Sequence, residues 1–140
     1  MCPGPPGPGR AGLPGAPGFY LPHRPEAETF VASSFQFLLP EWEPRRLRAM
    51  IAACAARGVE LKWFGAPEPV AFTSRYEHWR YAAPQPLPQT DAVLAGLIDM
   101  RLPLTFTPGD AALIARIIRA EVLRLGQAED LPEAGLTLGD

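Results

Sequence analysis

The sequence predicts an α+β fold of two layers, a small three-stranded sheet covered by helices. Apolar stripes with helical spacing at 47–54 and 113–125 indicate two amphipathic helices. Alternating or aromatic-rich stretches at 31–39, 59–64 and 102–106 indicate three strands. Hydrophobic residues make up 47% of the 140 residues, which is typical of a globular chain.

Residues 1–27 differ from the rest in composition, because Gly and Pro dominate their first two thirds. Five glycines approach the triplet spacing of collagen: Gly4, Gly7, Gly12, Gly15 and Gly18. Gly9 breaks that phase, and a triple helix needs Gly at every third position. We therefore expect a disordered tail at 1–27, a domain at 28–126 and a flexible acidic tail at 127–140. Alternatively, the first tail is G/C-rich DNA read in the wrong frame ahead of a truncated gene.

The first half of the domain predicts a strand, a helix and a second strand. Alternation along 31–39 gives one strongly apolar strand face, and Pro40 ends the strand. Pro44 occupies a first helical position, and Gly58 suits the left-handed residue that follows a helix. The buried stripe of this helix is Leu47, Met50, Ile51 and Cys54. The second strand is expected at 59–64.

The second half begins with an irregular, proline-rich aromatic loop at 65–89. Thr90 is expected to cap a short helix that includes Val93, Leu94, Leu97 and Ile98. A third strand is expected at 102–106, at a sheet edge because Pro103 cannot donate to a ladder. Thr107-Pro-Gly-Asp110 predicts a capped helix start, and Gly126 its end. The stripe of this last helix is Leu113, Ile114, Ile117, Ile118, Val122 and Leu125.

Charge and composition exclude several function classes. The net charge of −2 gives no reason to expect nucleic acid or an anionic membrane as a partner. No apolar run approaches the roughly 18 residues of a membrane span, and we expect no secretory signal, because no apolar h-region follows Arg10. Cys2 and Cys54 make a poor disulfide framework, and Cys54 is expected to be a small buried hydrophobe. A cytoplasmic location fits these observations.

Catalytic and metal sites are not predicted. His23 and His78 have no second ligand at helical or hairpin spacing. Lys62 is the only lysine, and a lysine can form a Schiff base with an aldehyde cofactor. Strand alternation places it beside Glu60 and opposite Trp63, so we expect it to face solvent or a neighbouring domain.

Aromatic residues are dense between positions 63 and 81, with Arg75 and Arg80 among them. Such a mixture can stack on a base or hold a phosphate, or it can pack the loop onto its own or another domain. The aromatic side chains are Trp63, Phe64, Phe72, Tyr76, Trp79 and Tyr81. The candidate substrate-facing residues are Lys62, Trp63, Arg75, Tyr76 and Trp79.

In their order, residues from about 29 to 124 resemble the C-terminal small domain of the DegT/DnrJ/StrS family of sugar aminotransferases. The matching pieces are Ser34-Phe-Gln-Phe-Leu-Leu-Pro40, Ala55-Ala-Arg-Gly-Val59, the loop ending in Arg75-Tyr76, Leu102-Pro-Leu104, and the helix after Thr107-Pro108. The resemblance implies the small-domain fold of aspartate-aminotransferase-like enzymes. Many members carry a histidine in the proline-rich stretch, where this chain has Val70-Ala71.

The resemblance also implies homodimeric enzymes that use pyridoxal phosphate to transfer an amino group from glutamate or glutamine to a keto-sugar nucleotide. In that family the reactive lysine and the cofactor-binding residues belong to a large domain that precedes the small one. Lys62 does not correspond to the family lysine. We therefore expect no catalytic or cofactor-binding residues in this chain and no transamination by the chain alone.

Three hypotheses remain open at this point. The chain is a truncated or frame-shifted aminotransferase fragment, with an exposed apolar face where the large domain docks. Alternatively, it is a stand-alone interaction or nucleotide-sugar-binding module derived from that domain. In the third hypothesis a separately encoded large domain complements it, and only the two chains together bind the cofactor.

Overall fold

The computed structural model describes residues 18–29, 31, 33–69, 75–78, 83 and 85–128, with residue 78 described for its backbone alone. Its elements confirm an α+β fold with one small three-stranded sheet. In chain order they are β1 (Ser34–Leu38), α1 (Pro44–Ala55), β2 (Lys62–Trp63), the 3₁₀ turn η1 (Tyr76–His78), α2 (Pro88–Leu94), β3 (Leu97–Arg101) and α3 (Pro108–Gly126). In the described part of the chain, no helix is long and apolar enough to cross a membrane.

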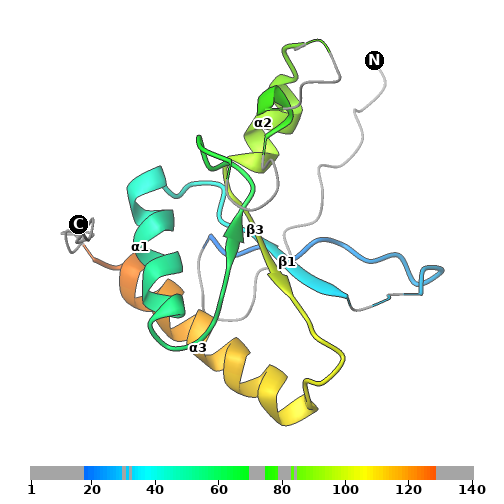
Figure 1. Cartoon of the computed structure of the whole chain (residues 1–140), viewed down its shortest axis with the longest axis vertical. Coiled ribbons are helices and arrows are strands. Elements are labelled where there is room, and N and C mark those ends of the chain that lie inside the picture. The colour runs from blue at the N-terminus through cyan, green and yellow to red at the C-terminus, as the bar shows by residue number, and fades with distance from the viewer. Residues whose placement is uncertain are drawn as a thin grey trace, which may run out of the picture.

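The sheet has the order β1-β3-β2, with β3 antiparallel to both neighbours. Phe37 pairs with Ile98, and Ile98 pairs with Trp63 on its other side. The two strands joined by α1 therefore run parallel with β3 between them. Figure 1 shows α1 and α3 packed together on one side of the sheet, while α2 stands beyond its upper end.

The core lies between the sheet and these two helices. Strand residues on the helix-facing side contact the apolar stripes of α1 and α3 predicted from the sequence. Each fully buried aliphatic side chain of this kind stabilises the fold by about 1.5–3 kcal/mol. The buried members from these elements are Phe37, Leu47, Ala49, Met50, Cys54, Trp63, Ile98, Met100, Ile117, Ile118, Val122 and Leu125. Leu113, the first residue of the predicted α3 stripe, is 50% exposed.

The domain begins earlier than the predicted boundary at residue 28. Phe19 is 2% exposed and its ring stacks on Phe37 at 4.7 Å between centroids. Tyr20 pairs with Leu38 through two backbone hydrogen bonds of 2.9 and 2.8 Å. The sequence analysis assigned these two residues to the tail because Gly and Pro dominate the residues before them. Residues 1–17 and 129–140, the remainder of the two expected tails, lie outside the described residues.

The position of the third strand also differs from the prediction. The strand is Leu97–Arg101, at the centre of the sheet, instead of 102–106 at an edge. Leu104 is fully exposed, although its alternation with neighbouring apolar residues is typical of a strand. α2 ends at Leu94 before the predicted helical stripe is complete, and its N-cap is Leu87 instead of Thr90. The strand expected at 59–64 is reduced to Lys62–Trp63.

The boundaries of the two long helices, α1 and α3, are confirmed where local chemistry marked them. Pro44 begins α1, and Gly58 adopts the expected left-handed conformation with φ of 82°. Thr107 and Asp110 form a capping box at the start of α3. The Asp110 amide donates to Thr107 Oγ1 at 3.2 Å, and the Thr107 amide donates to Asp110 Oδ2 at 2.8 Å.

Candidate functional site

The sheet has two different faces because side chains alternate along each strand. One face contributes to the core beneath α1 and α3. We call the opposite side the open face, since none of the described helices covers it (Figure 1). Arg101 on this face is exposed, and the other residues are half-buried. These are Ser34, Gln36, Leu38, Lys62, Leu97 and Asp99.

A polar row crosses the middle of the open face. Gln36 pairs with Asp99 on one side, and Lys62 pairs with Asp99 on the other. Gln36 Nε2 donates a hydrogen bond to Asp99 Oδ1 at 3.2 Å. Lys62 Nζ lies 5.1 Å from the ring centroid of Phe64, within range of a cation–π interaction. An amide, a carboxylate and an ammonium group thus follow one another across three strands.

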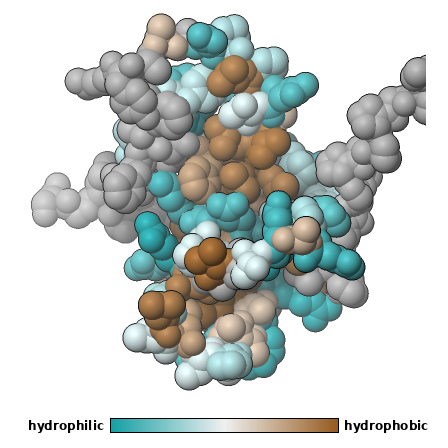
Figure 2. Space-filling view, turned by 90° about the vertical axis from the view of Figure 1, so that its right-hand side faces the viewer, coloured by the Kyte–Doolittle hydropathy of each residue, from teal (hydrophilic) through white to brown (hydrophobic). Residues whose placement is uncertain are grey.

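Apolar surface flanks this row. Leu38 and Leu97 pair across β1 and β3, and the Phe64 amide donates to the Leu97 carbonyl at 3.0 Å. Figure 2 shows this side of the molecule, with hydrophobic surface gathered in its centre above a hydrophilic belt, and again lower down at the level of the β3–α3 loop. That loop contains Leu104 and Phe106, which are 102% and 40% exposed.

Lys62 and Trp63, two of the five predicted site residues, lie on opposite faces. Lys62 belongs to the open face, which agrees with the expected strand alternation. Trp63 is 7% exposed and faces the core, with the Arg48 guanidinium 5.9 Å from its ring. Trp63 Nε1 also donates to the Ala95 carbonyl at 3.0 Å. Trp63, whose hydrogen bond and packing are internal, therefore does not share a face with Lys62, and its substrate-facing role stays a prediction.

Tyr76 attaches its loop to α2, whereas Arg75 pairs within the loop. The Tyr76 hydroxyl lies 3.2 Å from Asp91 Oδ2, to which it donates, and accepts from the Leu87 amide at 3.2 Å. Arg75 forms a 2.7 Å ion pair with Glu77 within the same loop. The structure thus does not gather these side chains with Lys62. Trp79, Phe72, Arg80 and Tyr81 lie outside the described residues.

Gln36 and Asp99 were missed by the sequence reasoning. Their apposition to Lys62 depends on strand register, and the sequence pattern had placed the third strand at 102–106. The available signal was Gly96, the glycine directly before β3. A Cβ atom on Gly96 would lie 2.7 Å from the Leu39 carbonyl oxygen, so the chain must pass β1 very closely there.

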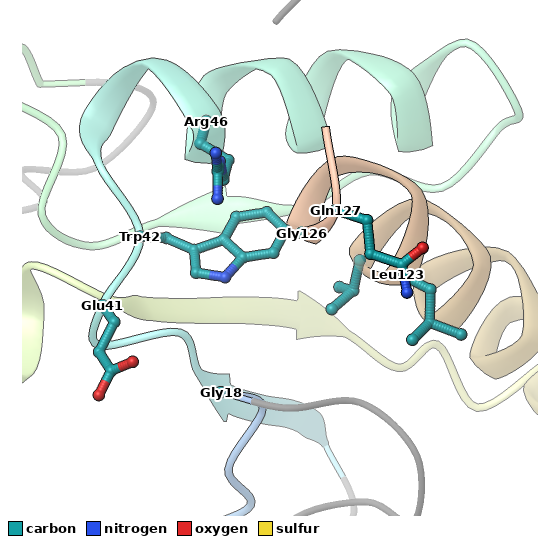
Figure 3. A pocket seen from close by; sticks show the side chains of 8 residues that line it. Gly18, Glu41, Trp42, Arg46, Leu123, Gly126 and Gln127 are labelled. Atoms are coloured by element: carbon teal, nitrogen blue, oxygen red, sulfur yellow. The ribbon is translucent and has the colours of Figure 1, made fainter. Parts of the chain in front are cut away.

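A separate hollow of about 240 Å³ lies on the helix side of the molecule (Figure 3). The Trp42 ring forms one wall, and the Arg46 guanidinium carbon lies 5.8 Å from the ring centroid. Arg46 Nη2 donates to the Ala128 carbonyl at 3.2 Å. The other lining residues are Gly18, Glu41, Val122, Leu123, Gly126 and Gln127.

Two titratable groups, Glu121 of α3 and Cys54 of α1, are buried. Glu121 is 7% exposed and forms ion pairs with Arg57 at 3.0 Å and Arg124 at 2.7 Å. Burial alone would raise the pKa of Glu121, but hydrogen bonds and charges of Arg124 and Arg57 outweigh it and hold the pKa below its usual value. Burial, and secondarily the charge of Glu121, raises the pKa of the free thiol of Cys54 to about 11. This thiol is therefore protonated, as expected of a buried hydrophobe.

Neither the start of α3 nor the described surroundings of Lys62 provides the phosphate-binding groups that pyridoxal phosphate needs. A phosphate needs free backbone amides or cations, but the start of α3 is closed by its own capping box and carries the Asp110 carboxylate. Lys62 stands on a sheet face between Asp99 and Phe64, without such a cradle among the described residues. Within the same residues, no cluster of three or more His, Cys, Asp or Glu side chains suits a metal ion.

No family model, curated protein or solved structure matches this chain.

Proposed function

We propose that this chain is the small domain of a pyridoxal-phosphate-dependent sugar aminotransferase of the DegT/DnrJ/StrS type, docking through its open face on a larger, cofactor-carrying domain. The observation that carries the proposal is the one-sided sheet. Helices α1 and α3 cover one face, and the other combines the Leu38–Leu97 pair with the polar row of Gln36, Asp99 and Lys62.

The composition of the open face supports docking over simple solvation. An antiparallel sheet that faces water usually carries polar residues on its outer side. Here Leu38 and Leu97 interrupt that pattern, and Phe64 lies beside them. Leu104 and Phe106 add exposed apolar surface in the loop that follows β3. Exposed apolar surface bordered by polar groups is typical of an interface.

In this proposal the two domains divide the chemistry, with the cofactor held by the larger domain. Pyridoxal phosphate, held by the larger domain, supplies the electron sink for amino transfer. In the docked state Lys62, Asp99 and Gln36 face the domain boundary, where an ammonium, a carboxylate and an amide can bind polar groups of a substrate. The isolated chain is inactive in this proposal.

The decisive experiment begins with the DNA upstream of the Met1 codon, translated in all three forward frames. The proposal predicts a large domain with its own lysine, in another frame or as a separate neighbouring gene. Co-expressed with the present chain, that domain should co-purify with it and bind pyridoxal phosphate. Leu97→Asp should abolish co-purification, while the matched change at the half-exposed Leu113 of α3, Leu113→Asp, should not. Absence of such a domain from the surrounding DNA, or a complex indifferent to Leu97→Asp, contradicts the proposal.

A second experiment checks that this chain has no cofactor site of its own. Lys62 is the only side-chain amine, so borohydride trapping with pyridoxal phosphate and mass spectrometry gives a single side-chain position to inspect, apart from the N-terminal amine. We expect no more modification of Lys62 in the folded chain than in the urea-unfolded chain. Selective, stoichiometric trapping at Lys62 in the folded chain would contradict the absence of a cofactor site.

The polar row beside Phe64 also favours a second candidate, a stand-alone module that binds a nucleotide sugar. Asp99 and Gln36 are suited to bind hydroxyl groups, Lys62 to bind a phosphate, and Phe64 to stack on a ring. UDP-glucose is a suitable probe, followed by tryptophan fluorescence. Saturable binding that is lost in Asp99→Asn supports this candidate. If UDP-glucose changes neither the fluorescence nor the amide chemical shifts, the candidate is contradicted.

A further inference from the structure

The hollow beside Trp42 has the components of a small-molecule site that is distinct from the open face. Figure 3 shows the Trp42 ring between Arg46 of α1 and the C-terminal end of α3, with the Gly18 backbone nearby. Val122 and Leu123 supply apolar side chains. Gly126 has no side chain, which leaves room beside the indole; a Cβ there would lie 3.5 Å from Trp42.

Arg46 supplies the polar group that fixes orientation. Its guanidinium carries five N–H donors, and Nη2 uses one of them on the Ala128 carbonyl. This bond and the stacking over Trp42 hold the planar group beside the hollow. A guanidinium positioned in this way binds a carboxylate through two parallel hydrogen bonds.

The size and the surrounding charges restrict the ligand. About 240 Å³ is below the usual range of drug-sized sites, roughly 300–1,000 Å³, and suits one ring with a short substituent. The exposed Glu41 carboxylate lies at the rim, so a second negative charge on the ligand would be repelled. A flat apolar ring matches the indole and the aliphatic side chains.

We propose that this hollow binds a small aromatic monocarboxylate, with its carboxylate on Arg46 and its ring against Trp42.

Benzoate is the probe, titrated into the full chain and followed by amide and indole chemical shifts. We expect saturable binding with a Kd of about 1 mM, as for a ligand of this size. Benzyl alcohol, which keeps the ring and lacks the charge, should bind about tenfold more weakly because it forgoes the charge-assisted bonds. Phthalate, with two carboxylates, should also bind more weakly than benzoate.

Two variant pairs locate the site. Gly126→Ala adds a Cβ at ordinary contact distance and should retain binding, whereas Gly126→Leu fills the hollow and should abolish it. Arg46→Gln should weaken benzoate about tenfold and leave benzyl alcohol unchanged. Circular dichroism confirms folding, and the Gly126 pair remains informative if Arg46→Gln unfolds.

Binding that survives Gly126→Leu overturns the proposal, as does equal affinity for benzoate and benzyl alcohol. The absence of shift changes at about 20 mM benzoate, well above the expected Kd, also overturns it.

Discussion

The Trp63 indole donates a 3.0 Å hydrogen bond to the Ala95 carbonyl, and this contact joins β2 to the turn between α2 and β3. Gly65 and Gly96 lie at the same junction, where an added Cβ would collide with backbone atoms of Leu94 and Leu39 respectively. Three distant chain segments therefore meet at one end of the sheet. Their contact fixes β3 between the other strands and so aligns Asp99 with Gln36 and Lys62.

Replacing Trp63 by Phe tests this junction. The change keeps an apolar ring in the core but leaves the Ala95 carbonyl without its indole donor. We expect the free energy of unfolding to fall by about 1–3 kcal/mol, because a part-buried hydrogen bond is lost and the smaller ring leaves part of the core unfilled. Urea unfolding followed by circular dichroism measures the loss, and an unchanged midpoint would show that the bond contributes nothing.

Gly96→Ala tests the close approach of the turn to β1. Its Cβ would lie 2.7 Å from the Leu39 carbonyl oxygen, so the backbone must shift. We expect a loss of about 1–3 kcal/mol, in the range of overpacked cores. The matched control is Gly109→Ala in the first turn of α3, where the nearest atom would be 3.6 Å away. This control should be neutral or stabilising by up to about 1 kcal/mol. Equal effects of the two changes on the urea midpoint would refute the steric explanation.

The ion pairs of Glu121 should make the folding stability of the chain fall at acid pH. Its folded pKa lies below the ordinary value, so its contribution is present above the unfolded pKa of about 4.3 and is lost as pH falls through the folded pKa. Glu121→Gln should cost about 1 kcal/mol at pH 7, a modest figure because both arginines are half-exposed. Urea unfolding near pH 3 should show a smaller difference in free energy of unfolding between the wild type and Glu121→Gln than at pH 7. A difference that grows toward low pH would contradict this prediction.

We expect the thiol of Cys54 to react slowly with disulfide reagents in the folded chain. Burial and a pKa of about 11 leave little thiolate at pH 8. In a Cys2→Ser background, a disulfide reagent should modify Cys54 at the rate of local or global unfolding instead of the rate of a free thiol. Reaction should become immediate in urea. Rapid modification of the folded chain at pH 8 would show that α1 and α3 open readily.

Local chemistry predicted the helices better than the strands. Pro44, Gly58 and the Thr107–Asp110 capping box mark helix ends through their own backbone preferences, which tertiary structure does not alter. Leu104 and Phe106 alternate like strand residues but remain exposed, because alternation does not reveal whether a neighbouring strand is present. Leu97 and Ile98 continue a helical stripe in the sequence, yet the close passage at Gly96 turns them into β3.

Only part of the candidate site could be predicted from the sequence, because the rest depends on strand pairing. Alternation correctly placed Lys62 on the side opposite Trp63. Gln36 and Asp99 join Lys62 only through the register of three strands that are distant in sequence. Phe19 was assigned to a tail because composition was averaged over Gly and Pro neighbours, whereas its stacking on Phe37 is a tertiary contact.

The central claim is that the open face is an unfilled docking surface, and binding of a hydrophobic dye to the full folded chain tests it most directly. We predict dye fluorescence well below the unfolding temperature, reduced by Leu97→Gln and by the double change Leu104→Gln, Phe106→Gln. The control Arg116→Gln, at an exposed position of α3, should leave the fluorescence unchanged. A monodisperse folded chain that binds no dye would contradict the claim.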